Sequence, residues 1–389
     1  MKVRYTTISL LFLWIICMPM SYLTRWAGAV TLISRMQVLA FVFALVIYIS
    51  GNVRIYKGLW LPILFILWHL CISLFYGNDM HSSMSLAFKL FTAYMLATHV
   101  AQKKEECGLR EVTYLFVIHL FLNAVTRLLP LSYVLNERAT YFLGSRVNIS
   151  DLLVYAISIA AIYYVLYKKL IVLLWVAILS GTYFCVVEAV STGIMSLIVF
   201  SLVIIYFLIA RNSAKGNWFP RVLVLIVFVG CLYFAFFPSD IAAKLNWLFE
   251  GFLKEDLTLN GRTKLWEIAI SQIEGIHWLV GYGYANGAVF ELENGFQATT
   301  AHSQYINILF RYGIIGFTLY FASIVQIIRQ CMKNSGIRYR VVVIASIVSM
   351  VITGIATTTY TVPYMFIWMA MLLNVEDVFG KEDYVTSLT

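Results

Sequence analysis

The chain has 389 residues, of which 61% are hydrophobic and only 12% are charged. Soluble domains carry about a quarter charged residues, so this composition excludes an ordinary soluble globular protein. The formal net charge of +9 would suit a nucleic-acid-binding protein, but most cations lie in short connections between apolar runs, so no nucleic-acid partner is expected.

Apolar runs predict an all-α, polytopic transmembrane helical bundle. Runs of about 18–23 apolar residues are long enough to cross a bilayer as helices. The first run is expected to be retained, since Pro19 and Met20 stand where a cleaved signal peptide would have small residues. The sequence predicts about twelve spans, at residues 6–24, 28–50, 59–76, 82–101, 112–129, 150–167, 170–187, 191–210, 219–237, 303–328, 341–359 and 361–375.

The distribution of lysine and arginine predicts the orientation of these spans. Every second connection is rich in cations, and the positive-inside rule places such connections and both termini in the cytoplasm. Two longer connections then face outward, at residues 130–146 and 238–302. The predicted organisation is spans one to nine in residues 1–237, a large outer loop with the site in residues 238–302, three further spans in residues 303–375 and a cytoplasmic tail in residues 376–389.

The large outer loop is predicted to contain one amphipathic helix. From Thr263 to Ile276, apolar residues recur at helical spacing, with Asn260 as a plausible N-cap. Such a helix would lie in the membrane interface or cover the end of the bundle. Gly281, Gly283 and Gly287 are expected to loosen the chain after it.

Several cations are predicted to lie in the outer half of the membrane or just outside it. Ionised side chains there are costly unless they are paired or line a polar pocket. One interpretation is that each of them reaches outward to lipid headgroups. Since acidic partners are scarce, the set as a whole favours a pocket for an anionic group such as a phosphate. These cations are Arg35, Lys89, Arg127, Arg138, Arg146 and Arg311.

Two residues of the outer loop are candidates for chemistry. Arg262 follows Gly261 at the start of the amphipathic helix, where a guanidinium beside helix amides can bind phosphate; the alternative is an exposed loop arginine. His302 directly precedes the tenth span, where a neutral imidazole can accept a proton from a hydroxyl. The alternative for His302 is a helix cap or a core hydrogen-bonding residue.

These motifs resemble those of the bacterial O-antigen ligase and polymerase superfamily. His302-Ser303, nine residues, Gly313, two residues and Gly316 form a pattern similar to its histidine signature. Arg262 in Gly-Arg-x-x-x-Trp resembles the arginine of the family's large periplasmic loop, and Gly144-Ser145-Arg146-Val147-Asn148 is a weaker match to the segment that carries its second arginine. The family often has Ser-Arg at the start of the span after Glu188, whereas Ser191-Thr192-Gly193 stands there in this chain.

The resemblance implies an enzyme of the inner membrane with a periplasmic active site. It implies transfer of a glycan from undecaprenyl diphosphate to a sugar hydroxyl. A direct displacement at the anomeric carbon would invert it and would require no metal or cofactor. His302 and Arg262 would be catalytic, with His302 as the base. Arg146 would bind the diphosphate with Arg262, and the reserve candidates for this contact are Arg311, Arg138 and Arg35.

The acceptor distinguishes two activities within this family. A polymerase uses another lipid-linked repeat unit, and a ligase uses the lipid A-core. Polymerase is preferred because the outer segments are compact. A lipid-linked glycan transporter is the alternative from another class, although it should show charges near the midplane or on both sides. Expected partners are the lipid-linked glycan, membrane lipids, a chain-length regulator and a flippase.

Overall fold

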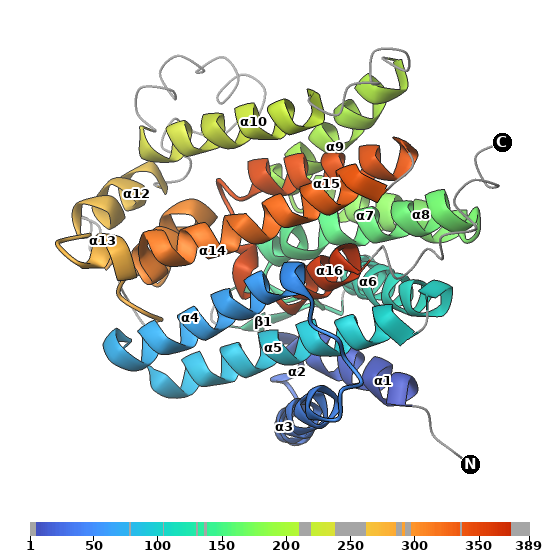
Figure 1. Ribbon diagram of the computed structural model, residues 1–389, viewed down its shortest axis with the longest axis horizontal. Coiled ribbons are helices and arrows are strands. Elements are labelled where there is room, and N and C mark those ends of the chain that lie inside the picture. The colour runs from blue at the N-terminus through green and yellow to red at the C-terminus, as the bar shows by residue number, and fades with distance from the viewer. Residues whose placement is uncertain are drawn as a thin grey trace.

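The computed structural model describes residues 5–77, 79–103, 105–129, 131–135, 138–209, 219–237, 262–284, 290–291, 297–334 and 337–374. Long helices lie side by side and give the molecule the form of a bundle (Figure 1). Each of the twelve predicted segments contains one of them, so the all-α interpretation of the sequence is confirmed. They are α1 (Tyr5–Cys17), α3 (Ala27–Ile49), α4 (Trp60–Tyr76), α5 (Met80–Lys103), α6 (Glu105–Leu128), α7 (Ser150–Tyr167), α8 (Ile171–Val187), α9 (Ser191–Ile209), α10 (Phe219–Phe236), α14 (Gln304–Asn334), α15 (Ile337–Thr353) and α16 (Pro363–Leu373).

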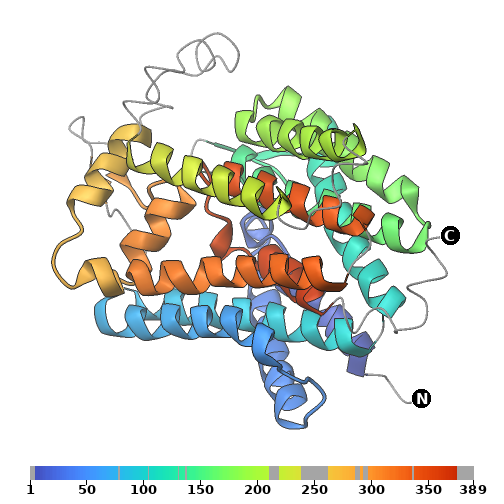
Figure 2. The same cartoon turned by 45° about the horizontal axis from the view of Figure 1, so that its top comes forward.

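Five helical segments of the described chain are both long and apolar enough to cross a membrane. They are residues 28–49, 80–103, 106–128, 146–167 and 304–332, and shorter apolar helices accompany them. α3 lies at the edge of the bundle and exposes Leu32, Val38 and Ile49, as expected for a face that contacts lipid (Figure 2). α16, in contrast, is buried along its whole length and lies in the centre. The chain is therefore an integral membrane protein.

The first predicted span differs from the structure in its continuity. α1 ends at Cys17, and the short helix α2 (Met20–Leu23) follows after Pro19. Proline has no N–H to continue the hydrogen-bond ladder and disfavours helical geometry in the residue before it, which explains the break.

Short connecting elements complete the described structure. Strands β1 (Tyr133–Leu135) and β2 (Arg138–Thr140) form an antiparallel hairpin in which Val134 pairs with Ala139. Strands β3 (Phe290–Glu291) and β4 (Gln297–Ala298) form a second one. The remaining helices are α12 (Arg262–Ser271), α13 (His277–Val280) and the single 3-10 turns η1 (Lys57–Leu59), η2 (Arg146–Ile149) and η4 (Thr359–Thr361).

The helix predicted from Thr263 to Ile276 is shorter in the structure. α12 ends at Ser271, where the amide of Ile273 donates to the carbonyl of Ile270 in a tightened last turn, and Gly275 adopts a positive φ of 51° in the turn before α13. Its apolar stripe is real, because Leu265, Trp266 and Ala269 are buried. With α13, the helix covers one end of the bundle beside the start of α14 (Figure 2). The predicted N-cap, Asn260, lies outside the described residues.

The glycines after α12 fix the chain, which contradicts the prediction that they loosen it. A Cβ on Gly281 would lie 2.3 Å from the backbone of Arg311, and one on Gly283 would lie 2.8 Å from the amide of Gly77. The amides of Tyr282 and Gly283 donate to the carbonyls of Phe310 and Arg311 at 2.9 and 2.8 Å. The third glycine, at position 287, lies outside the described residues.

Candidate functional site: a cavity lined by Arg146, Arg262 and His302

The segment around His302 is held by hydrogen bonds on both sides. The amide of Ala301 donates to Oδ1 of Asn307 at 3.0 Å, and that of His302 donates to Oγ1 of Thr300 at 2.9 Å. The amide of Gln304 donates to the carbonyl of Gly354 at 2.7 Å, which ties the start of α14 to the end of α15. The backbone position of His302 is thus determined by two other parts of the fold.

His302 itself has an unusual backbone conformation. Its φ is +51°, in the left-handed region that residues other than glycine rarely adopt, although His, Asn and Asp are enriched there. Such geometry typically costs about 1–3 kcal/mol and persists where the surroundings impose it. The side chain is exposed and lines a cavity. A locally strained histidine facing a cavity favours a functional role over a helix-capping role.

Trp266 connects the arginine motif to the histidine motif. It lies one helical turn after Arg262 on α12, is 0% exposed and packs edge-on against Phe234 of α10. Its indole Nε1 donates to the carbonyl of Ala301 at 2.8 Å. Since Ala301 immediately precedes His302, this bond fixes Arg262 relative to the histidine. The Gly-Arg-x-x-x-Trp spacing therefore has a structural reason.

The segment between α6 and α7 contributes Arg146 to the same place. Asn123 of α6 accepts the amide of Leu143 at 2.8 Å, which positions the turn after β2. Ser145 then donates to Oδ1 of Asn148 at 2.5 Å across η2, the turn that begins with Arg146. Arg146 donates to the carbonyl of Glu188, the C-cap of α8, at 3.4 Å. Arg146, the residue of the weaker arginine motif, thus reaches the site from this 3-10 turn.

Glu188 supplies a carboxylate at this site and forms an ion pair with Arg127 of α6. Tyr141 lies beside this pair and is 4% exposed. Burial, with the Glu188 carboxylate as the second cause, raises the pKa of Tyr141 to about 12, so the phenol stays neutral at physiological pH. From the sequence, Arg127 was counted among the outer cations without an assigned partner, because the elements that bring it together with Glu188 are remote in sequence.

Three of the predicted site residues line one cavity of about 670 Å³. Arg146, Arg262 and His302 come from η2, α12 and the segment before α14. α12 begins at Arg262, α14 begins two residues after His302, and α7 follows the turn that begins with Arg146, so the positive dipole ends of these helices lie near the cavity. The other lining residues are Ala139, Tyr141, Ser145, Val147, Asn148, Glu188, Thr300, Ala356, Thr357 and Thr358.

The electrostatics of this cavity favour an anion. Among its described lining residues, Glu188 is the sole carboxylate, and Arg127 offsets its charge. Arg146 and Arg262 place two guanidinium groups on this lining, and the hydroxyls of Ser145 and Thr357 lie beside them, donating to Oδ1 of Asn148 and to the carbonyl of Thr353. Within the described part of the chain, no group of three or more His, Cys, Asp or Glu side chains is arranged to hold a metal. A diphosphate fits this donor set through bidentate arginine contacts.

The reserve candidates lie elsewhere or outside the description. Arg311 is 7% exposed, donates to the carbonyl of Thr299 at 2.8 Å and stacks on Tyr284 at 4.7 Å. It therefore braces the segment before His302 and does not line the cavity. Arg35 is exposed on α3, at the edge of the bundle. Arg138 begins β2, and its side chain lies outside the described residues.

The glycines of the histidine signature serve a kink in α14. Gly313 has a φ of +61° and interrupts the helix, and a Cβ there would lie 2.2 Å from the carbonyl oxygen of Leu279. The break leaves carbonyls of α14 without helical partners, and other segments donate to them. The amides of Tyr282 and Gly283 donate to two of these carbonyls, and the indole of Trp68 donates to the carbonyl of Tyr312 at 2.9 Å. At Gly316, a Cβ would lie 3.1 Å from the indole of Trp68. The histidine of the signature thus lines the cavity, and its two glycines allow α13 and α4 to pack closely against α14.

Apart from Glu188, the described lining residues that the sequence reasoning missed are neutral. Thr357 and Thr358 follow α15, and Tyr141 follows β2. The available signal was the run of three hydroxyl residues from Thr357 to Thr359 at the end of an apolar run. Thr359 is used structurally, because its hydroxyl donates to Oε1 of Gln304 at 2.5 Å.

Comparison with known proteins gives one family match. Residues 175–321 match the sequence model of the O-antigen ligase family. The matched region includes Glu188, Arg262, His302 and both signature glycines, whereas Arg127 and Arg146 lie before it. A search of curated proteins gave no significant match. The region from residue 175 to 321 thus confirms, by an independent comparison, that this chain resembles the bacterial O-antigen ligase and polymerase superfamily.

Proposed function

We propose that this protein is an O-antigen polymerase, or a polymerase of a related surface polysaccharide, acting on undecaprenyl-diphosphate-linked repeat units. The family match supports a glycosyltransferase of the O-antigen ligase and polymerase type that uses lipid-linked glycans. The observation that carries the proposal is the single cavity lined by Arg146, Arg262 and His302, which come from three separate segments.

Arg146 and Arg262 are proposed to bind the diphosphate of the donor. Negative charge on this group increases as the glycosidic bond to phosphate breaks, so preorganised cations stabilise the transition state more than the ground state. The N-termini of α7, α12 and α14 add partial positive charge at the same wall. Glu188, paired with Arg127, is proposed to orient Arg146 through its main-chain carbonyl.

His302 is proposed to accept the proton of the acceptor hydroxyl. The hydroxyl oxygen attacks the anomeric carbon, a new C–O bond forms, and the bond from that carbon to the diphosphate oxygen breaks. The proton passes to the imidazole, and undecaprenyl diphosphate leaves with the bonding electron pair. A direct displacement of this kind inverts the anomeric centre and needs no metal.

The cavity is proposed to face the periplasm, with both termini in the cytoplasm of an inner-membrane protein. The alternation of cationic connections in the sequence supports this orientation. A flippase that delivers the donor and a regulator of chain length are proposed as functional partners, since the enzyme would consume a donor made on the cytoplasmic side.

Ligation to lipid A-core is the second candidate, favoured by the description of the matched family. A deletion strain separates the two. Loss of the polymerase leaves one repeat unit attached to lipid A-core and removes the ladder of longer chains. Loss of attached units altogether, with accumulation of lipid-linked polymer, would identify a ligase. Loss of attached repeat units with the donor retained in the cytoplasmic leaflet would instead support a transporter.

Variants of His302 and Arg262 test the division of roles in purified, nanodisc-held protein. His302→Asn removes the base and keeps a residue type that tolerates positive φ, so turnover should fall by about 10²–10⁴-fold with donor binding kept. Arg262→Ala should lower both turnover and donor affinity, and Arg262→Lys should restore them only in part. Arg25→Gln, which replaces an exposed outer arginine outside the cavity, is the matched control. Near-normal turnover in His302→Asn would remove the base assignment.

A further inference from the structure

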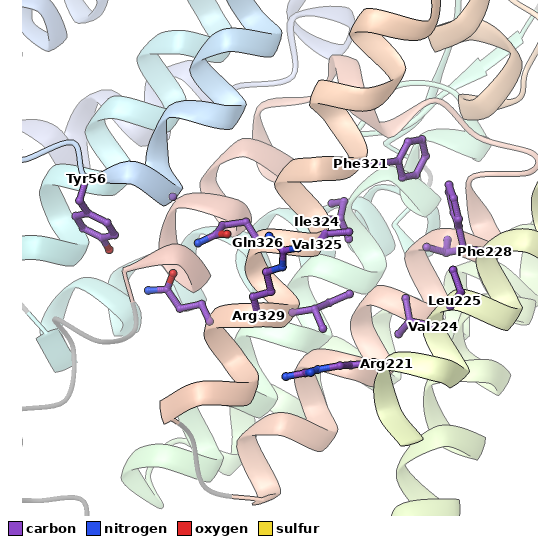
Figure 3. A pocket seen from close by; sticks show the side chains of 14 residues that line it. Tyr56, Arg221, Val224, Leu225, Phe228, Phe321, Ile324, Val325, Gln326 and Arg329 are labelled. Carbon is purple, nitrogen blue, oxygen red and sulfur yellow. The ribbon is translucent and has the colours of Figure 1, made fainter. Parts of the chain in front are cut away.

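A second cavity, of about 1010 Å³, lies between α10, α14, α15 and the segment around η1. Its wall is mainly apolar and includes Val224, Phe228 and Val325, while Arg221 and Arg329 line it as well (Figure 3). The side chain of Gln326 lies against Gly58, where a Cβ would be 2.7 Å from its Nε2, so the segment before α4 closes this side. The cavity is a groove with distinct apolar and cationic parts.

The directions of α10 and α14 place the aromatic residues at one end of the groove and the two arginines at the other. α10 and α14 run in opposite directions (Figure 2), and the rings of Phe228 and Phe321 are 4.6 Å apart. Arg221 precedes Phe228 by seven residues, and Arg329 follows Phe321 by eight. At a rise of about 1.5 Å per residue, both arginines lie roughly 10–12 Å from the aromatic pair, on the same side of it. Figure 3 shows Arg221 extending from α10 across the gap towards α14.

The two arginines have no acidic partner among the described residues. The ion pairs found there involve Arg110, Arg127 and Lys169, and the described lining of the groove contains no carboxylate. Both arginines are exposed in the protein alone. Lone arginines near a membrane surface often reach to bulk headgroups, but here two of them border a walled apolar groove. The complementary ligand has an anionic head and an apolar chain.

We infer that this groove binds an anionic phospholipid, with its phosphate between Arg221 and Arg329 and an acyl chain along Val224, Val325 and Phe321. α14 begins beside His302 and passes the groove near its other end, so the groove lies at the opposite end of the bundle from the donor cavity. The lipid therefore belongs to the opposite leaflet and is distinct from the glycan donor. It fills the space between α10 and α14, two helices that also support α12.

Lipid retention by purified full-length protein tests this site. The protein is exchanged into nanodiscs of phosphatidylglycerol and phosphatidylcholine, extracted into mild detergent and examined by native mass spectrometry. Wild type should retain one phosphatidylglycerol in preference to phosphatidylcholine. Arg221→Gln with Arg329→Gln should weaken this retention about 10- to 30-fold. Arg54→Gln with Arg338→Gln removes two exposed cations outside the groove and should leave it unchanged.

A second variant separates the groove from its charges. Val325→Trp keeps both arginines but fills the path of the acyl chain, so retention should fall while thermal unfolding still shows a folded protein. If the Arg221/Arg329 variant retained phosphatidylglycerol as well as wild type, the proposed site would be overturned. If the Arg54/Arg338 control lost as much retention as that variant, the binding would be general attraction of anionic lipid to surface cations and not a specific site. Recovery of a polyprenyl phosphate in place of phospholipid would overturn the assigned ligand.

Discussion

The hydrogen bond from Trp266 to Ala301 should position the catalytic segment, and Trp266→Phe tests this. The substitution removes the donor that lies 2.8 Å from the Ala301 carbonyl, with Trp266 and Ala301 both 0% exposed. A buried carbonyl left without its partner costs about 1–3 kcal/mol. The Ala301 carbonyl can find another partner only if its segment moves. Because Ala301 adjoins His302 and Trp266 shares α12 with Arg262, such a movement would displace the two proposed site residues relative to each other.

The expected result is a loss of turnover greater than the loss of stability alone explains. A displacement of about 1 Å in a catalytic constellation can lower the rate by about 10²-fold, so a fall of at least about tenfold is expected. The assay combines turnover of a lipid-linked repeat unit, donor affinity and thermal unfolding in the same nanodiscs. Chain growth by the variant enzyme should slow while the protein remains folded.

Trp368→Phe is the matched control for this prediction. Trp368 is also 0% exposed, and its Nε1 donates to Oγ of Ser158 at 2.9 Å in the middle of the bundle. Ser158 keeps a second partner, because Ser346 donates to it at 2.7 Å. This variant should lose stability and keep near-normal turnover. If both tryptophan variants lost activity only in proportion to stability, the proposed positioning role would be refuted.

Two further predictions concern the kink and the topology. Gly313→Ala places a Cβ 2.2 Å from the Leu279 carbonyl at a positive φ and should lower the unfolding temperature markedly. Gly230→Ala, in a helix with open space around it, should leave the unfolding temperature equal or raise it. Equal effects of the two substitutions would contradict the structural role of the kink. In a cysteine-free background, single cysteines at Ser132 and Gly261 should react with an impermeant reagent added from outside and one at Asn212 should not, and the reverse pattern would place the cavity in the cytoplasm.

The sequence by itself determined the membrane class and the helical segments, and it predicted Arg262 and His302, which the structure places on one cavity. Apolar runs specify helices because a backbone in hydrocarbon must satisfy its own hydrogen bonds, so length and hydropathy suffice. The glycine, arginine and tryptophan spacings also appear directly in the sequence. Their family resemblance was confirmed by the match over residues 175–321.

Only the tertiary structure decided which cations share a cavity. Arg146 and Arg262 both reach it, whereas Arg311 braces a carbonyl and Arg35 lies on an edge helix. Arg35, Arg146 and Arg311 belonged to one set of outer cations in the sequence, because position along the chain does not show where a side chain points or which remote helix faces it. Gly281 and Gly283 show the same limit of sequence reasoning. Glycine permits either a mobile chain or close backbone contact, and only the packing against Arg311 and Gly77 shows that these two glycines serve close contact.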